Sequence, residues 1–266
     1  MDLTSLDRIR AAHDRTELVL GARSAPLAGG TWLFSEPQPD LVELVDLTTL
    51  GWPPVEVDGA GLTIAATCTL RTLADLSPVR GWSSQHLVAR CARSLAASEK
   101  IWDAATVGGN IALALPAGAM TSLAVALDAT AVVWTSDGGE RRQPVLDLVT
   151  GVRTTTLTPD EVLRAVTVQA QVLAQPAAFR RIALTRQGRS GAVVIGRRDP
   201  AGGLVVTVTA SVPRPYRLAF PTPPSAADLH DAVDAVDDWY DDPHGAPDWR
   251  RAMTLRLAEQ VREELA

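Results

Sequence analysis

The spacing of hydrophobic positions changes along the chain between two periods, one typical of strands and one typical of helices. Residues 41–47 form a short apolar run and residues 62–67 alternate with β-branched side chains, so both predict buried strands. Residues 84–99 and 248–265 place apolar side chains three or four positions apart, which predicts amphipathic helices. A polar helix is predicted over residues 4–14. This mixture, without tandem repeats, indicates an α+β fold.

Turn-forming residues divide this pattern into three parts. Prolines within residues 51–54 end the first part, and a stretch rich in Gln, Ala and Pro at residues 169–178 ends the second. The last part holds three strand-like segments, a Gly-Gly hairpin turn and two helices, the first of which begins near Ser225 with a capping box. It therefore predicts a three-stranded antiparallel sheet with helices. The expected domains are residues 1–52, 53–168 and 169–266; the other expected strands are 131–134, 161–166, 179–184, 191–195 and 204–209, and the other expected helices are 70–74 and 122–127.

Composition narrows the classes of partner. The 266 residues carry a net charge of −6, whereas a domain that binds nucleic acid or an anionic membrane presents a basic face. No apolar run approaches the roughly 20 residues of a membrane span. The N-terminus lacks a basic segment followed by an apolar stretch, so no secretory signal is expected. We predict a cytoplasmic protein without nucleic-acid or membrane partners.

The residue types that usually carry catalysis or bind metals are scattered. The four histidines lack metal-ligand spacing, and Cys68 and Cys91 form no CxxC pair, so they are predicted to be buried free thiols. The acidic residues between positions 231 and 242 lack the spacing of a calcium loop and are predicted to be a solvated helix face. We therefore predict no metal site and no catalytic side chain. Six arginines near the C-terminal strands either meet a phosphate or an acidic partner, or are solvated strand ends: Arg180, Arg181, Arg186, Arg189, Arg197 and Arg198.

Two Gly-Gly pairs carry the main candidate chemistry. Adjacent glycines let a ligand approach the backbone, and successive amides can form a concave site for an anion such as phosphate. Neither pair belongs to a GxxxxGK[ST] or GxGxxG motif, and for each pair taken alone a tight turn is the favoured interpretation. Together, with short hydroxyl and amide side chains beside them, they predict one diphosphate held from two sides. The first glycine loop is Ala28, Gly29, Gly30, Thr31 and Trp32, and the second is Thr106, Val107, Gly108, Gly109 and Asn110.

The two loops and their neighbours resemble the FAD-binding medium subunit of the molybdenum hydroxylases, the xanthine dehydrogenase and carbon monoxide dehydrogenase group. That family has an AGGT loop followed by a strand that ends in LVDL, and an ATVGGN loop followed by PAAD and LLALDA. It continues with GYRxTxL and an aromatic-x-Lys start of the last domain. The corresponding segments here occur in the same order: residues 28–32 and 44–47, 99–110, 116–119 and 125–129, 151–157, and 179–181.

The resemblance implies a fold, a cofactor and partners. The fold would be a two-part FAD-binding region, with a small N-terminal α/β unit and a middle α+β unit, followed by the C-terminal domain. Both glycine loops, together with Ile101 and Arg181, would bind FAD. The subunit would pass electrons from iron–sulfur clusters through FAD to NAD or another acceptor. Its partners would be a large subunit with the molybdenum cofactor, which hydroxylates the substrate, and a small 2Fe–2S subunit.

This chain departs from the family pattern beside both loops. Trp32 replaces an Asp or Asn, Trp102 and Asp103 replace an Arg-Asn pair, and Ala119 replaces an Asp. The Asp that Ala119 replaces bonds the ribityl chain of FAD in that family, and losing this hydrogen bond would cost about 1 kcal/mol, which weakens FAD binding without excluding it. Two alternatives therefore stay open. One is a flavin-poor or flavin-free structural subunit of the same kind of complex. The other is a stand-alone flavin oxidase, for whose substrate domain 266 residues leave little room.

Overall fold

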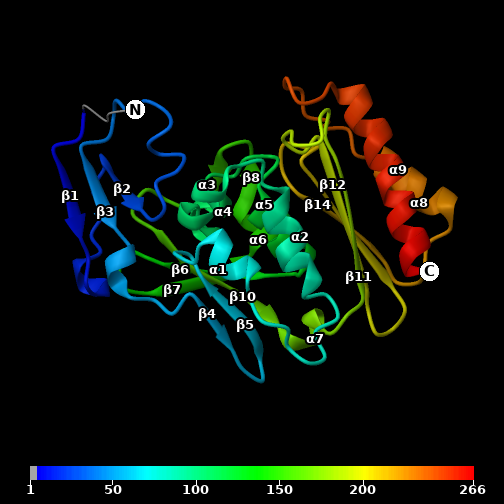
Figure 1. Ribbon diagram of the computed structural model, residues 1–266, viewed down its shortest axis with the longest axis horizontal. Helices are drawn as coiled ribbons and strands as arrows, with labels where there is room; N and C mark the ends of the chain where they lie inside the picture. The colour runs from blue at the N-terminus through cyan, green and yellow to red at the C-terminus, as the bar shows by residue number, and fades with distance from the viewer. Residues whose placement is uncertain (1–4) are drawn as a thin grey trace.

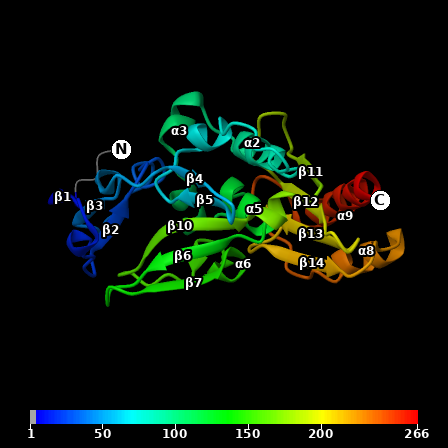
Figure 2. The same ribbon diagram turned by 90° about the horizontal axis from the view of Figure 1, so that it is seen from below.

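Three main sheets lie in a row, with helices between and beside them, and a short two-stranded sheet accompanies them. The computed structural model describes residues 5–266. A small sheet lies at the N-terminal end of the longest axis, a five-stranded sheet with most of the helices lies in the middle, and a four-stranded sheet with two helices lies at the C-terminal end (Figures 1 and 2).

The N-terminal sheet consists of three parallel strands in the order β1-β3-β2. β3 confirms the strand predicted at residues 41–47, but the helix predicted over residues 4–14 is wrong within the described chain. A strand forms there instead, because Arg8 and Arg10 both reach the buried Glu43 of β3, at 2.8 and 3.3 Å. The helical segments of this part are short 3₁₀ turns, so the expected α/β unit has no α-helix within residues 5–52. Its elements are β1 (Arg8–Ala11), η1 (Arg15–Glu17), β2 (Ser24–Leu27), β3 (Glu43–Asp46) and η2 (Thr48–Leu50).

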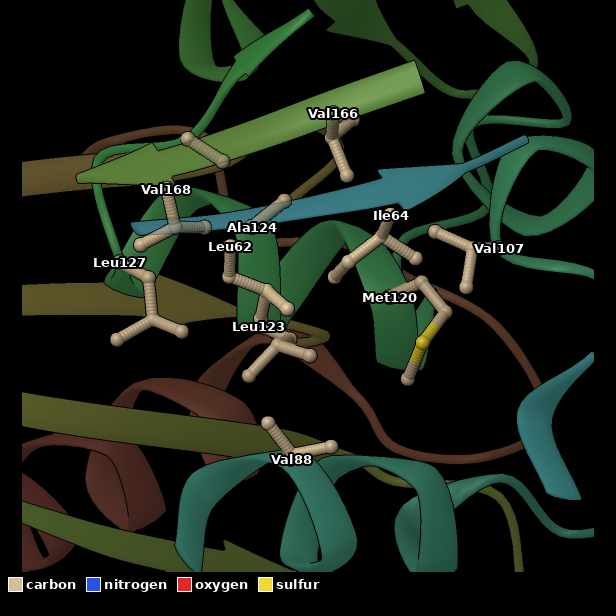
Figure 3. Close-up of a pocket in the computed structure, with 11 residues that line it drawn as sticks. Leu62, Ile64, Val88, Val107, Met120, Leu123, Ala124, Leu127, Val166 and Val168 are labelled. Carbon is tan, nitrogen blue, oxygen red and sulfur yellow. The ribbon is translucent and has the colours of Figure 1, made fainter. Parts of the chain in front are cut away.

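The middle sheet is antiparallel, with the strand order β4-β5-β10-β6-β7. One of its faces packs on α5, and α2 packs on the far side of α5, as Figure 3 shows. Leu62 and Val168 of the sheet meet Leu123 of α5 and Leu127, the C-cap of that helix, around a residual cavity of about 10 Å³ with a wholly apolar lining. The strands are β4 (Val55–Val57), β5 (Gly61–Ala65), β6 (Thr130–Trp134), β7 (Glu140–Pro144) and β10 (Val162–Gln169), and a separate pair is β8 (Val149–Gly151) and β9 (Thr154–Thr155).

The helices of the middle part follow the predicted pattern with shorter bounds. Thr69 is the N-cap of α1, because its hydroxyl accepts a hydrogen bond from the amide of Thr72 at 3.1 Å. The helix predicted over residues 84–99 ends at Ser94, since Leu95 is extended. The helices are α1 (Leu70–Ala74), α2 (His86–Ser94), α3 (Glu99–Ala104), α4 (Val107–Ala112), α5 (Ala119–Ala126), α6 (Val145–Leu148) and α7 (Ala170–Leu173).

The C-terminal sheet has four antiparallel strands where three were predicted. The unpredicted strand is β14, which is half exposed and flanked by prolines at positions 213, 215 and 221, so its sequence resembles a turn more than a core strand. The capping box at Ser225 is confirmed at the start of α8. The elements are β11 (Ala177–Ile182), β12 (Ala192–Arg198), β13 (Leu204–Thr209), β14 (Tyr216–Phe220), α8 (Ala226–Asp234) and α9 (Pro247–Leu265).

The C-terminal sheet is fixed to the middle part by polar bonds across α5. Arg197, which is 3% exposed, is ion-paired with Asp128 and donates to the carbonyl of Ala126 at 3.0 Å. The amide of Ala210 donates to the carbonyl of Pro116 at 2.8 Å. The ion pair between Arg197 and Asp128 is therefore structural. The bond from Ala210 to Pro116 also ties the C-terminal sheet to the segment that precedes α5.

Membrane-spanning helices and metal-binding clusters are both absent from residues 5–266. No helix there has both the length and the apolar character needed to cross a bilayer. No cluster of three His, Cys, Asp or Glu side chains in the same residues could hold a metal ion.

Candidate functional site

A deep cleft of about 580 Å³ lies where the three parts of the chain meet. A cleft of this size fits a cofactor-sized ligand. The two glycine loops come together here, because a Cβ added to Gly29 would overlap the backbone carbonyl of Ala104, just before the second loop. The N-terminal part accordingly lies beside α3 and α4 (Figure 1). The cleft is lined by residues 26–33, 38 and 47 of the N-terminal part, residues 66, 94–97, 101, 105, 106, 108–110, 112, 113, 115, 117, 118, 153, 157 and 161–163 of the middle part, and residue 189.

The first glycine loop presents a row of unused backbone donors. It follows β2 directly, and the chain then turns back, with the amide of Phe34 donating to the carbonyl of Gly30 at 2.9 Å. Gly30 has a φ of +64°, and a Cβ there would come within 2.6 Å of the Phe34 ring, so a glycine is required. The N–H groups of residues 28–32 donate no hydrogen bond to any group within residues 5–266. Successive free amides at a cleft are the feature expected of an anion site.

The second glycine loop is the first turn of α4 rather than an open loop. Thr106 is the N-cap, and its hydroxyl accepts a hydrogen bond from the amide of Gly109 at 3.2 Å. The amides of Val107 and Gly108 donate to carbonyls of the segment that follows β5, at 2.9 and 2.8 Å. The amide of Asn110 donates to the carbonyl of Thr106 at 3.0 Å. The backbone donors of this loop are therefore used inside the protein, and the free amides belong to the first loop.

Asn110 contributes a side-chain donor instead. Its Oδ1 accepts a hydrogen bond from the amide of Met120 at the start of α5, at 2.8 Å. This bond orients the side-chain amide, which leaves Nδ2 as a donor on a residue that lines the cleft. The same bond ties the second loop to α5.

Most of the predicted site residues come together in the cleft. Two do not line it. Val107 is 2% exposed and belongs to the hydrophobic core. Arg181 donates from Nε to the Ser190 hydroxyl at 2.7 Å and from Nη2 to the Gly188 carbonyl, so it holds the loop that follows β11. The predicted residues that line the cleft are Ala28, Gly29, Gly30, Thr31, Trp32, Ile101, Thr106, Gly108, Gly109 and Asn110.

Three charged residues of the lining were not among the predicted site residues. Arg189 lies on the loop that Arg181 holds, and it was only one of six arginines with two open interpretations. Arg153 has a φ of +56°, and its Nη1 donates to Glu36 at 3.2 Å, which joins the middle part to the first-loop segment. The family-like segment at residues 151–157 could have marked Arg153.

Glu161 is a carboxylate in the cleft wall that the protein itself neutralises. Its side chain is 10% exposed and accepts two hydrogen bonds of 2.7 Å from Arg141. Those bonds, assisted by the amide of Thr158, hold the pKa of Glu161 below its ordinary value against the effect of burial. Glu161 is therefore an ionised residue that fixes the wall rather than a proton donor.

Trp32 adds an indole group to the donors of the first loop. Its Nε1 is shielded from solvent and has no hydrogen-bond partner within the described chain. The free amides, the indole N–H and Asn110 Nδ2 are all donors, whereas the acidic group of the lining is occupied by Arg141. A ligand with many acceptor oxygens, such as a diphosphate ester, fits this set.

The sequence comparison agrees with this chemistry. Residues 5–169 match the family described as FAD binding domain in molybdopterin dehydrogenase. The chain belongs to this family. FAD is its cofactor, and the diphosphate at the centre of FAD is the kind of group that the free donors of the cleft fit. A comparison with curated proteins found no match.

Solved structures share the fold over nearly the whole chain. The carbon monoxide dehydrogenase from Hydrogenophaga pseudoflava that lacks the Mo-pyranopterin moiety of its molybdenum cofactor is 21% identical, with a TM-score of 0.80 over 96% of this chain and 95% of that chain. The reconstituted CO dehydrogenase from Oligotropha carboxidovorans is 21% identical, with a TM-score of 0.84 over 100% of both chains. Quinoline 2-oxidoreductase from Pseudomonas putida 86 is 19% identical, with a TM-score of 0.80 over 100% of this chain and 99% of that chain.

Proposed function

We propose that this chain is the electron-transferring flavin subunit of a multi-subunit molybdenum hydroxylase. It would take electrons from 2Fe–2S clusters in a small subunit, after a molybdenum subunit has oxidised a substrate such as a purine, an aldehyde or an N-heterocycle. It would pass them to NAD or another acceptor. The observation that carries the proposal is the cleft with its row of free amides at residues 28–32. Bound FAD supplies the redox chemistry, and the protein supplies binding and orientation.

Each part of the cleft has a role in that arrangement. The amides of the first glycine loop would hold the diphosphate, and Asn110 Nδ2 would donate to FAD from the second loop. Gly109 is exposed toward the cleft, and a Cβ there would meet only the Thr106 hydroxyl, so this position leaves room for the cofactor. Glu161, fixed by Arg141, keeps its part of the cleft wall in place. No side chain of the chain is required to transfer a proton.

The partners are proposed on two grounds. The chain has two cysteines, Cys68 and Cys91, which are too few for one 2Fe–2S cluster, and both are buried free thiols. The solved structures with the same fold include two CO dehydrogenases and a quinoline oxidoreductase. We therefore propose a separate iron–sulfur subunit and a molybdenum subunit, in a cytoplasmic complex.

The flavin content of the purified chain tests the proposal. We expect one FAD per chain, seen as flavin absorption in the visible spectrum and identified by chromatography after release from the protein. Anaerobic addition of NADH then tests the acceptor, because bleaching of the flavin is expected if NAD is the redox partner. A chain that takes up no FAD when reconstituted would contradict the proposal, and so would a monomer that oxidises a substrate without any partner subunit.

A further inference from the structure

Trp32 occupies a fixed position in the first glycine loop. Its carbonyl accepts hydrogen bonds from the amide of Ser35 at 2.9 Å and from the Ser35 hydroxyl at 2.7 Å. The preceding turn is closed by the bond between Phe34 and Gly30. The backbone that carries the indole is therefore fixed by the loop itself, whose residues line the cleft.

The indole N–H of Trp32 is a donor without an acceptor. Leaving a buried N–H unpaired is unfavourable, because water that could accept its hydrogen bond is excluded. A second tryptophan, Trp102 on α3, has the same property, but it does not line the cleft. Trp32 is therefore an unpaired indole in the lining of the cleft, and Trp102 is an unpaired indole outside that lining.

The first glycine loop offers the cleft hydrogen-bond donors and no cationic side chain. The two arginines of the lining, Arg153 and Arg189, lie on other segments, and Arg153 is paired with Glu36. No basic side chain belongs to the first glycine loop. A diphosphate seated on the amides of residues 28–32 would therefore be met by neutral donors, and the Trp32 indole adds a side-chain N–H to the backbone N–H groups of this loop.

We infer that the Trp32 indole N–H donates a hydrogen bond to a diphosphate oxygen of FAD, reached by a rotation of the indole toward the cleft. This inference rests on the proposed FAD site and adds a side-chain donor to it. The indole stands where the resembling family carries Asp or Asn, so position 32 keeps a side-chain group that can contact the diphosphate. The chemical class recognised is a diphosphate ester, which includes ADP as well as FAD.

Trp32→Phe tests the inference, since it keeps an aromatic ring and removes the N–H. In the full chain stripped of flavin, titrations with FAD, ADP and riboflavin should show about a ten- to hundredfold weaker Kd for FAD and ADP, with riboflavin unchanged, because a hydrogen bond to a charged group is lost. Trp102→Phe is the matched control and should change each Kd less than about threefold. Equal affinities of wild type and Trp32→Phe for FAD would overturn the inference, as would a loss confined to FAD and riboflavin. Failure of the wild type to bind either FAD or ADP would instead remove the proposed function itself.

Nuclear magnetic resonance gives a second measurement, made on the wild-type chain and assigned with the variant. The chain has seven tryptophans, so seven indole N–H signals are expected. Addition of ADP should move one of them downfield and slow its exchange with solvent, and that signal should be the one absent in Trp32→Phe. If ADP binds and no indole signal moves, the inference is wrong.

Discussion

Gly108 and Gly109 are adjacent in the second glycine loop, but the structure predicts opposite consequences for replacing them. A Cβ on Gly108 would overlap the side chain of Ala66 and lie 2.8 Å from its backbone Cα and O atoms, so α4 could not pack on the end of β5. Such overpacking costs about 1 to 3 kcal/mol, and the upper value is expected because backbone atoms must move. A Cβ on Gly109 meets only the Thr106 hydroxyl, at 2.9 Å, and faces the cleft.

Replacement of Gly109 should therefore affect the cofactor and spare the fold. Valine gains a few tenths of a kcal/mol of helix propensity over glycine and loses part of the Thr106 cap, so the free energy of unfolding should change by less than about 1 kcal/mol. Its side chain would occupy the cleft, and we expect Gly109→Val to lose its FAD. Gly108→Ala should instead unfold at a clearly lower denaturant concentration.

The assay is urea unfolding of the flavin-free chain, followed by circular dichroism, beside the FAD content of the purified protein. Flavin-free protein must be used for the unfolding curves, because bound FAD would stabilise only the variants that retain it. A Gly109→Val chain with full FAD content would refute the placement of this residue in the cofactor cleft. A Gly108→Ala chain as stable as wild type would refute the packing of α4 on β5.

Three further predictions follow from individual contacts. Thr106→Ala removes the cap hydrogen bond to Gly109 and should lower the free energy of unfolding by about 1 kcal/mol, measured in urea; an unchanged value would contradict the capping geometry. Burial raises the pKa of the Cys68 thiol to about 12 and raises that of Cys91 as well, so the native protein should react slowly with a thiol reagent at pH 8 and fast once unfolded. Since these folded-state values lie above the roughly 8.5 of an unfolded thiol, the associated stability is complete below that pH and is lost as the pH rises toward 12. The pKa of Glu161 is lowered instead, so its contribution to the free energy of unfolding is present above about pH 4.3 and is lost on acidification. Glu161→Gln should lower the free energy of unfolding by about 2 kcal/mol at neutral pH. The stability of this variant should also fall less steeply in acid than that of the wild type.

The sequence pattern predicted the elements that bury a regular face. The strands at residues 41–47 and 62–67 and the last helix were confirmed because their apolar positions repeat with one period. β1 and β14 were missed because they lack such a repeat. β1 is stabilised by ion pairs to Glu43, and β14 is a half-exposed edge strand between prolines. Both strands form because of contacts with residues far away in the sequence, and such contacts produce no local pattern of apolar positions.

The same limit applies to the cleft. Both glycine loops could be found from local sequence, because glycine beside short polar residues has a restricted set of uses. Arg189 and Glu161 could not, because their place in the cleft depends on how a loop and a strand end pack against segments far away in the chain. Arg181 illustrates this limit. It was predicted to bind FAD, but its guanidinium bonds Ser190 and Gly188 and so holds the loop that carries Arg189.

The two glycine pairs, which look equivalent in the sequence, are used in different ways. In the first loop, Gly30 permits the turn that leaves the amides of residues 28–32 without internal partners. In the second loop every amide from Val107 to Asn110 already has a partner, so its glycines supply close packing at Gly108 and open space at Gly109. Affinity for an anion should therefore depend on the first loop, and the shape of the ligand that fits should depend on the second. It follows that substitutions in the second loop would discriminate between FAD and smaller diphosphates such as ADP, whereas those in the first loop would weaken both alike.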